Sequence, residues 1–218
     1  MTASPVSPPV FKGALVAVDP LRPTSSVIVF QYNPETITRT LQARTTGGEA
    51  GSGPLRISGP PEETLKLTIE VDATDQLETG DPIAETLGVV PALAALELLL
   101  YPSSAMVIAN EVLARAGVVE ILPMAAPLTL LVWGTRRILP VRVTDFSVTE
   151  EAFDPALNPV RAKVDLGLRV VSYYDTGMLS AAGALSIANH VAREVLATVN
   201  TAQSAASAVR SAAGLGRR

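Results

Sequence analysis

The side chains that could carry out chemistry are few in this sequence and are poorly spaced for it. His190 is the only histidine, so a Ser-His-Asp triad or an imidazole metal site would have to depend on it. Asp72, Asp75, Glu78 and Asp81 follow one another closely, yet the spacing and closing glutamate of a calcium-binding EF-hand loop are missing. We therefore expect a solvated acidic loop that leads into a helix, with Asp81 as the helix cap.

The glycine-rich stretch 47–59 is a poor candidate for a phosphate cradle. It has no Gly-Lys-Ser/Thr signature and does not lead from a strand into a helix. The nucleophile signature G-x-S-x-G and the zinc signature H-E-x-x-H do not occur. Cysteine is absent, which excludes a thiolate metal site. The sequence predicts a protein that is not an enzyme, with no cofactor and no metal.

Composition restricts the class of protein further. The 218 residues are 48% hydrophobic and 17% charged, with a net charge of −4, so we expect no nucleic-acid contact, which usually needs clustered lysine and arginine. No run reaches the ~18 uncharged apolar residues of a membrane span, and the N-terminus lacks the pattern of a signal peptide. We expect synthesis in the cytoplasm and no membrane contact by this subunit.

Alternation of apolar and polar residues predicts a mainly β domain over residues 12–175. In the last part of that domain the apolar residues change parity between Val143 and Phe146, which predicts a β-bulge near Thr144 and Asp145. The predicted strands are Gly13–Val18, Val27–Tyr32, Thr36–Arg44, Thr64–Val71, Leu128–Trp133, Arg137–Glu150 and Arg161–Val171.

Three other segments flank or interrupt these strands. Residues 1–11 are rich in proline and predict an extended N-terminal arm. Glycine, serine and proline dominate residues 46–62, which predicts a flexible loop. Residues 81–117 predict a helical insertion that contains Ile83–Leu87, Pro91–Leu100 and Ser104–Ala116 as helices.

Residues 176–218 are rich in alanine and contain no proline. They predict a long amphipathic helix that ends in a disordered tip at Gly214–Arg218. Its apolar side must dock on its own domain or on a neighbour, so we regard it as a candidate interface. The candidate interface residues are Ile187, Val191, Val195, Leu196 and Val199.

Two motifs carry a resemblance to a known family. A strand followed by a sharp Asn33-Pro34 turn and a second strand resembles the opening of the tube proteins of contractile injection systems, the phage-tail-like machines. The F-Q-[FY]-N-P-E motif of that family matches Phe30, Gln31, Tyr32, Asn33, Pro34 and Glu35. Its later strands and turn match Trp133, Gly134, Val143, Phe146, Val148, Phe153, Asp154, Asn158, Pro159, Val160, Arg161, Ala162 and Val164.

One position departs from the family pattern. Asn158 stands where the family usually has glycine. We expect this to be tolerated, because asparagine accepts the left-handed backbone region more readily than most residues.

The resemblance implies a small phage tail-tube-like β-barrel or sandwich with a flanking helix. Six copies would form a homohexameric ring by pairing strands between neighbours. It also implies a tube initiator near the baseplate, whose partners are the inner tube protein, a VgrG-like spike protein and baseplate wedge proteins. Longer relatives often carry a LysM-type peptidoglycan-binding domain, which the alanine-rich helix replaces here. The particle would assemble in the cytoplasm, with lysis as a route of release.

Two other functions stay open at this point. The first is the bulk inner-tube subunit of the same machine. The second, from a different class, is a β-barrel ligand-binding module or a hydrolase with an unrecognised site. A neutral pocket, or loss of activity on replacing a carboxylate such as Asp145, would favour the second.

Overall fold

The computed structural model describes residues 11–18, 26–46, 56–117 and 128–215, with 26 and 205–215 described by backbone alone. The predicted arm at 1–11 lies almost wholly outside these ranges, as do the middle of the predicted loop and the last three residues of the predicted tip. The chain divides into two compact units, Met1–Val170 and Val171–Arg218.

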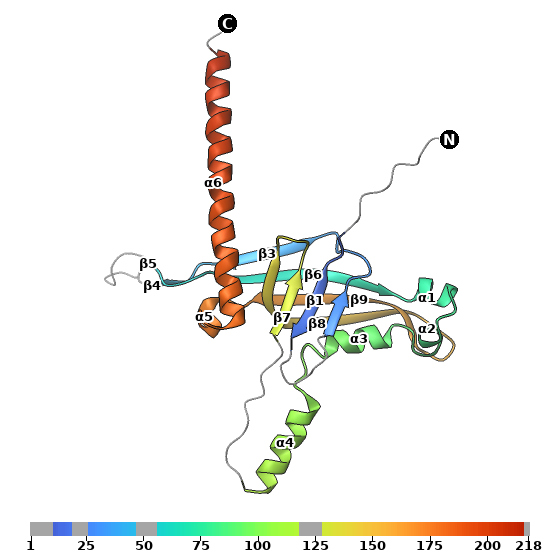
Figure 1. The fold of residues 1–218 in the computed structure, drawn as a ribbon. Coiled ribbons are helices and arrows are strands. Elements are labelled where there is room, and N and C mark those ends of the chain that lie inside the picture. The colour runs from blue at the N-terminus through green and yellow to red at the C-terminus, as the bar shows by residue number, and fades with distance from the viewer. Residues whose placement is uncertain (1–10, 19–25, 47–55, 118–127, 216–218) are drawn as a thin grey trace, which may run out of the picture. The chain divides into compact units, whose positions relative to one another are not determined.

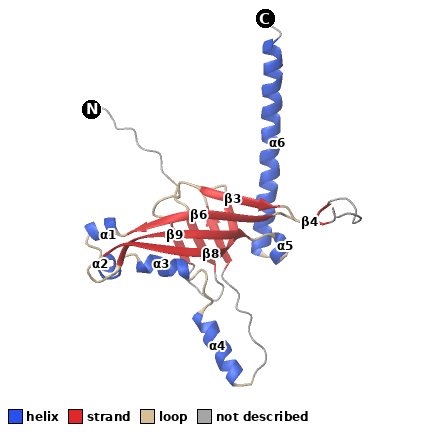
Figure 2. Cartoon of the chain, turned by 180° about the vertical axis from the view of Figure 1, so that it is seen from behind, coloured by secondary structure: helices blue, strands red, loops and turns tan. Residues whose placement is uncertain are grey.

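The first unit is built on one antiparallel sheet of seven strands (Figures 1 and 2). The chain is thus mainly β with a C-terminal helix, as predicted, but the sheet is not closed into a barrel. Its strand order is β2-β1-β7-β8-β9-β6-β3. The strands are β1 Ala14–Val18, β2 Ser26–Val29, β3 Ile37–Gln42, β6 Glu62–Asp72, β7 Leu128–Val132, β8 Ile138–Phe153 and β9 Pro159–Val170.

The core lies on the inner face of this sheet, where alternate residues of β1, β6, β7 and β9 are buried. In β6 these are Leu65, Leu67 and Ile69, and in β9 they are Ala162, Val164, Leu166 and Leu168. Because successive side chains of a strand point to opposite faces, this alternation fixes the register of β6 against β9, in which Leu67 lies opposite Leu166. Both strands were predicted from this pattern, and both are confirmed.

The predicted β-bulge is confirmed. The pairing of β8 with β9 shifts register between Val143 and Asp145, so Val143 and Phe146 both pack against the core despite their parity. Gly167 lies opposite Asp145 in the ladder, and a Cβ atom on Gly167 would stand 2.4 Å from Asp145 Oδ2. The bulge therefore requires glycine on the partner strand.

The predicted strands Gly13–Val18 and Val27–Tyr32 are found as β1 and β2, which pair with Leu15 opposite Ile28, although β2 ends at Val29 and not at Tyr32. Beyond it, Phe30–Thr36 connects the two ends of the sheet, because β2 is one edge strand and β3 is the other. The strands on either side of Asn33-Pro34 therefore do not pair with each other. Sequence alternation could not reveal this, since strand order depends on distant pairings.

The helices of the first unit are α1 Thr74–Glu78, α2 Pro82–Leu87, α3 Val90–Glu97 and α4 Ser104–Arg115. Asp81 caps α2 as predicted: its Oδ1 accepts hydrogen bonds from the backbone N–H groups of Ile83 at 2.8 Å and Ala84 at 3.5 Å. Helices α1, α2 and α3 gather at one end of the long strands, whereas α4 lies away from the sheet (Figure 1).

Two predicted loops contain regular structure. The acidic stretch after β6 forms α1, because Asp72 accepts hydrogen bonds from the backbone N–H and the hydroxyl of Thr74 and so starts a helical turn. The predicted flexible loop at 46–62 contains a short ribbon of β4 Thr45–Thr46 and β5 Arg56–Ile57. β-Branched threonine and isoleucine favour strands, which explains the ribbon within a stretch otherwise rich in glycine.

The second unit consists of α5 Tyr173–Thr176 and α6 Ala181–Leu215. Helix α5 was not predicted; Ser172 and Asp175 form a capping box at its start. A Cβ atom on Gly183 would stand 1.9 Å from the carbonyl oxygen of Gly177, so glycine permits the close approach of α5 and α6. Helix α6 continues through Gly214 and Leu215, which were predicted to belong to the disordered tip. Within the described ranges, no helix has the length and apolar character needed to cross a membrane.

Candidate assembly interface

We call the connection Phe30–Thr36 between β2 and β3 the corner. Asn33 of the Phe30–Glu35 motif binds the corner to the residues just before β1. Gly13 N donates a hydrogen bond to Asn33 Oδ1 at 2.8 Å, and Asn33 Nδ2 donates to the carbonyl oxygen of Phe11 at 2.8 Å. The side-chain amide thus offers β1 an acceptor and a donor, as a neighbouring strand would. It extends the pairing of β1 beyond the end of β2.

The glutamine of the same motif fastens the corner to the opposite half of the sheet. Gln31 Oε1 accepts a hydrogen bond from the backbone N–H of Asp72 at 2.9 Å, at the end of β6. Tyr32 and Glu35 are exposed, and Pro34 is half-buried. The motif therefore divides into buried or bonded residues that hold the corner and exposed residues that face outward.

Phe30 and Trp133 bring the two resemblance segments together in the core. Phe30 is 2% exposed, and its ring centroid lies 6.4 Å from that of Trp133. Gly13 lies beneath both rings, since a Cβ atom on it would stand 2.7 Å from Phe30 and 2.9 Å from Trp133. Gly134 follows in a bend with a φ of 71°. Gly13 was not predicted as a packing residue. Its only signal in the sequence is its position at the start of an alternating strand.

The turn after β8 is held by Asp154. Its Oδ1 accepts from the backbone N–H groups of Ala156 at 2.7 Å and Asn158 at 2.8 Å, and its Oδ2 accepts from Asn158 Nδ2 at 2.8 Å. The side chain and then the backbone N–H of Asn158 lower the pKa of Asp154 below its ordinary value. Phe153, just before the turn, is exposed.

Asn158 does not need the left-handed conformation that asparagine tolerates, because its own φ is not positive. That conformation falls on Leu157, with a φ of 67°. Asn158 instead uses its amide to bind Asp154 and the carbonyl oxygen of Thr86, the latter at 3.1 Å. The reason for asparagine here is hydrogen bonding between the turn and α2.

Pro159 is buried and marks where the turn meets the helices. Its carbonyl oxygen accepts from Val89 N at 2.9 Å. A Cβ atom on Gly88, whose φ is 55°, would stand 2.2 Å from that same oxygen. Gly88 was missed because a glycine between two helical runs indicates only a helix end.

Asp72 is the point where the two motifs meet. Its backbone binds Gln31, and its Oδ2 accepts a hydrogen bond from Arg161 Nε at 2.7 Å. Burial raises the pKa of Asp72, but hydrogen bonds from Thr74 and Arg161 outweigh burial and lower that pKa below 3.8; Asp72 in turn raises the pKa of Arg161. The only signal for Asp72 in the sequence is its place directly after an alternating strand, at the start of an acidic stretch.

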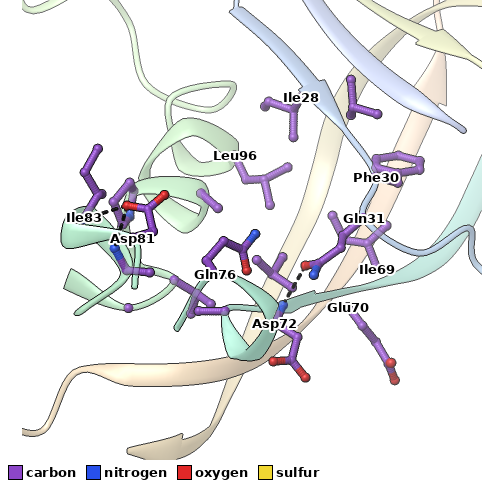
Figure 3. Close-up of a pocket in the computed structure, with 18 residues that line it drawn as sticks. Ile28, Phe30, Gln31, Ile69, Glu70, Asp72, Gln76, Asp81, Ile83 and Leu96 are labelled. Atoms are coloured by element: carbon purple, nitrogen blue, oxygen red, sulfur yellow. Dashed lines mark hydrogen bonds between the residues drawn. The ribbon is translucent and has the colours of Figure 1, made fainter. Parts of the chain in front are cut away.

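A cavity of about 330 Å³ opens beside β2 (Figure 3). Its wall is mostly apolar and comes from β2, the end of β6, α2 and α3, including Ile28, Phe30, Ile69, Val89 and Leu96. Figure 3 shows Gln31 bonded to Asp72 on one side and Asp81 at the start of α2 on the other. Gln31, Asp72 and Asp81 at the border of the cavity therefore already bind within the chain, and Glu70 and Gln76 are the other polar side chains labelled there (Figure 3).

Four of the five predicted interface residues of α6 are exposed, namely Val191, Val195, Leu196 and Val199. The fifth, Ile187, is half-buried. His190 lies 3.6 Å from Glu194 on the same helix. Among the residues that the structure describes, no cluster of three or more metal-binding side chains occurs, and no buried side-chain nitrogen or oxygen lacks a partner.

No protein-family model matches this chain, and a search of curated proteins finds no match either. The geometry of the described residues therefore has to support any functional assignment. That geometry consists of turns and side-chain hydrogen bonds that hold the connection between β2 and β3 against the sheet, together with exposed apolar surfaces.

Proposed function

We propose that this chain is a structural subunit of a contractile injection system or phage-tail-like particle, without catalytic activity. It forms a hexameric ring at the junction of baseplate and inner tube, links the spike to the tube and initiates tube assembly. One observation carries this proposal: the Phe30–Glu35 motif joins the two edge strands of a single sheet, β2 and β3, and is hydrogen-bonded to the residues just before β1 and to the end of β6, next to those edges.

Strand edges are the physical reason for a ring. Within the described ranges, β2 pairs only with β1, and β3 pairs only with β6. Such edges present unpaired N–H and carbonyl groups that invite another strand. Because the two edges belong to different strands, pairing β2 of one copy with β3 of the next is a head-to-tail contact, which closes into a ring when the rotation allows it. The barrel that one copy leaves open is then completed by six.

The remaining surfaces suit the other partners. In this proposal the exposed loops contact a VgrG-like spike, the inner tube protein and the baseplate wedge. The exposed apolar side of α6 binds an adjacent subunit or a wedge protein. Assembly takes place in the cytoplasm, and the subunit then leaves the cell only as part of the particle.

The edge contact can be tested with lysine, which discourages strand pairing when it lies on an edge. Thr40→Lys and Gln42→Lys change exposed residues of β3 that lie opposite Thr64 and Glu62, so neither faces a like charge. The matched control is Ser147→Lys, an exposed residue of the central strand β8. We expect the control to form hexamers by native mass spectrometry and rings by electron microscopy, and the β3 variant to remain monomeric with unchanged melting. Hexamers of the β3 variant would contradict the proposal.

The cavity beside β2 favours the alternative of a ligand-binding module, because its volume lies within the range of small-molecule sites. Three of its polar side chains, Gln31, Asp72 and Asp81, already bind groups of the chain itself. Few polar groups are then left to orient a ligand. An apolar small molecule that raises the melting temperature in the wild type but not in Leu96→Trp would support this alternative.

A further inference from the structure

The outer face of one half of the sheet is apolar. In β1, Leu15 and Ala17 point into the core, so Val16 and Val18 point outward. The register places Val27 opposite Val16 on β2 and Leu130 opposite Val16 on β7. We call this surface the valine face. Its exposed or half-buried members are Val16, Val18, Val27, Val29, Leu128, Leu130, Val132 and Ile138, while Ala14 and Pro140 share the face but are buried.

The other half of the same outer face is polar. On β6 and β9 the outward positions carry Lys66, Glu70, Lys163 and Asp165. A sheet with one solvated face alternates in this way along each strand, whereas strands that are apolar on both sides are usually covered on both sides. The valine face therefore has the composition of a buried surface, yet Val27 is 57% exposed and Val29 is 55% exposed.

Helix α4 has an apolar side that the rest of its own chain leaves largely uncovered. At 100° per residue, Met106, Ile108, Val112 and Leu113 lie on one side of it, but none of its residues is buried. Ile108 is 64% exposed and Val112 is 60% exposed. Glu111 lies on the other side and Arg115 at the border of the apolar side, and the two pair with each other, with Arg115 Nε 2.9 Å from Glu111 Oε1. Both figures show α4 standing apart from the sheet of its own copy (Figures 1 and 2).

We infer that the valine face of one copy is covered by α4 of a second copy. The two surfaces match in length: the twelve residues of α4 extend about 18 Å, and the five residues of β1 extend about 17 Å. They also match in charge, since no member of the valine face is charged and the two charges of α4 neutralise each other away from the centre of its apolar side. Electrostatic repulsion therefore does not oppose contact between the two surfaces.

This inference rests on the proposed ring and adds a second contact to it. The valine face begins on β2, the edge strand that receives the next copy, and is therefore continuous with the proposed strand contact. A neighbour that adds a strand at this edge also brings its own α4 close to the face. Each copy then gives one helix and receives one, which is the arrangement of a head-to-tail ring.

Cysteine cross-linking tests this contact cleanly, because the chain has no cysteine. Two full-length copies with different tags are co-expressed, one carrying Val27→Cys and the other Val112→Cys, and are treated with a short bis-maleimide. We expect a product that carries both tags. Two matched controls should give at least fivefold less of it: Glu111→Cys, on the charged side of α4, and Lys66→Cys, on the polar half of the sheet face.

The outcomes separate this inference from the proposed ring. Equal yields for Val112→Cys and Glu111→Cys would overturn the contact. So would a Val27→Cys/Val112→Cys double variant that cross-links only within one chain, because α4 then covers its own sheet. Native mass spectrometry of the same samples reports the ring: hexamers without the specific cross-link overturn this inference alone. A specific cross-link in particles no larger than a dimer supports the helix contact and contradicts the ring.

Discussion

Arg161 donates a hydrogen bond from Nε to Asp72 Oδ2 over 2.7 Å, joining the ends of β9 and β6 at the residue whose backbone also binds Gln31. The ion pair lies where the first motif, the last long strand and the start of α1 converge. It connects segments that are far apart in the chain, because Asp72 and Arg161 are partners in the β6–β9 ladder.

The first prediction concerns acid stability. The folded-state pKa of Asp72 lies below its ordinary value of 3.8, so Asp72 contributes stability that is fully present above that value. The contribution is lost as pH falls through the folded-state pKa. We expect Asp72→Asn to be less stable than the wild type at pH 7 and to approach it as the pH falls through the folded-state pKa of Asp72, which lies below 3.8. Urea unfolding between about pH 2 and pH 7 measures this. A constant difference between the two proteins across this range would contradict the prediction.

The second prediction concerns a charge on the inner face of the sheet. Arg39 Nε lies 2.6 Å from Glu63 Oε1, and the Glu63 side chain is only 5% exposed. Arg39→Met should lower the free energy of unfolding by about 2–3 kcal/mol, because a buried carboxylate loses its cation. Adding Glu63→Leu should recover most of that loss, since a buried pair is often replaced by apolar residues at little cost.

Its matched control is Lys163→Met. Lys163 Nζ lies 3.2 Å from Glu151 Oε1, and both side chains are more than one-third exposed. Such exposed pairs contribute about 0.5 kcal/mol. If Lys163→Met and Arg39→Met destabilise the protein equally, burial of Glu63 is not the cause.

The third prediction separates two effects of glycine. Gly88 has a φ of 55° and no room for a Cβ atom next to the carbonyl oxygen of Pro159, whereas Gly117 has a φ of 77° and open space around it. Gly88→Ala should destabilise by about 3 kcal/mol, through strain and steric clash together. Gly117→Ala should cost about 1 kcal/mol through backbone strain alone. Thermal unfolding compares them, and equal losses would show that the contact with Pro159 has no effect.

The fourth prediction is a stabilising change. Leu157 is 78% exposed and adopts a φ of 67°, a conformation that a leucine side chain disfavours. Leu157→Gly should raise the free energy of unfolding by about 0.5–1 kcal/mol, because glycine adopts this region without strain. The neighbouring Ala156→Gly should instead lower it, because glycine there only adds conformational entropy to the unfolded chain. A loss of stability in Leu157→Gly would mean that the leucine side chain makes contacts that outweigh the strain.

The fifth prediction concerns α6 in assembly. Val195→Glu together with Val199→Glu places two charges on the exposed apolar side of that helix. We expect normal melting of the isolated protein but few intact particles when it is co-expressed with spike, tube and wedge proteins. Asn200→Glu adds a charge at an exposed position on the polar side and should assemble normally. Particles in normal yield from the double variant would exclude this side of α6 from the interface.

The sequence predicted those parts of the fold that depend on local alternation. The strand β9 and the bulge at Asp145 follow directly from which residues are apolar. The helix α1 was missed because its start depends on the side chain of Asp72 bonding to Thr74, and α5 was missed because it is a single capped turn. The order of the strands in the sheet could not be predicted, because it depends on pairs of residues that are far apart in the chain. Ile37 pairs with Leu67, and Leu15 pairs with Leu131.

The candidate interface was only partly predictable. The motif residues Phe30, Gln31 and Asn33 were selected by resemblance, and the structure gives each a physical role in holding the corner. The valine face was not anticipated, because apolar residues on both sides of a strand indicate only a buried strand. Its exposure becomes apparent only when the register assigns Val16, Val27 and Leu130 to one side.

The short connection between β2 and β3 has a geometric consequence. Its side chains are anchored next to both edges, Asn33 to the residue just before β1 and Gln31 to the end of β6, so in the proposed ring its length would set the angle between incoming and outgoing neighbours. In a closed assembly that angle determines how many copies complete one turn and how wide the central bore is. A single residue inserted after Pro34 would then change the stoichiometry of the assembly and leave the core of each subunit as it is.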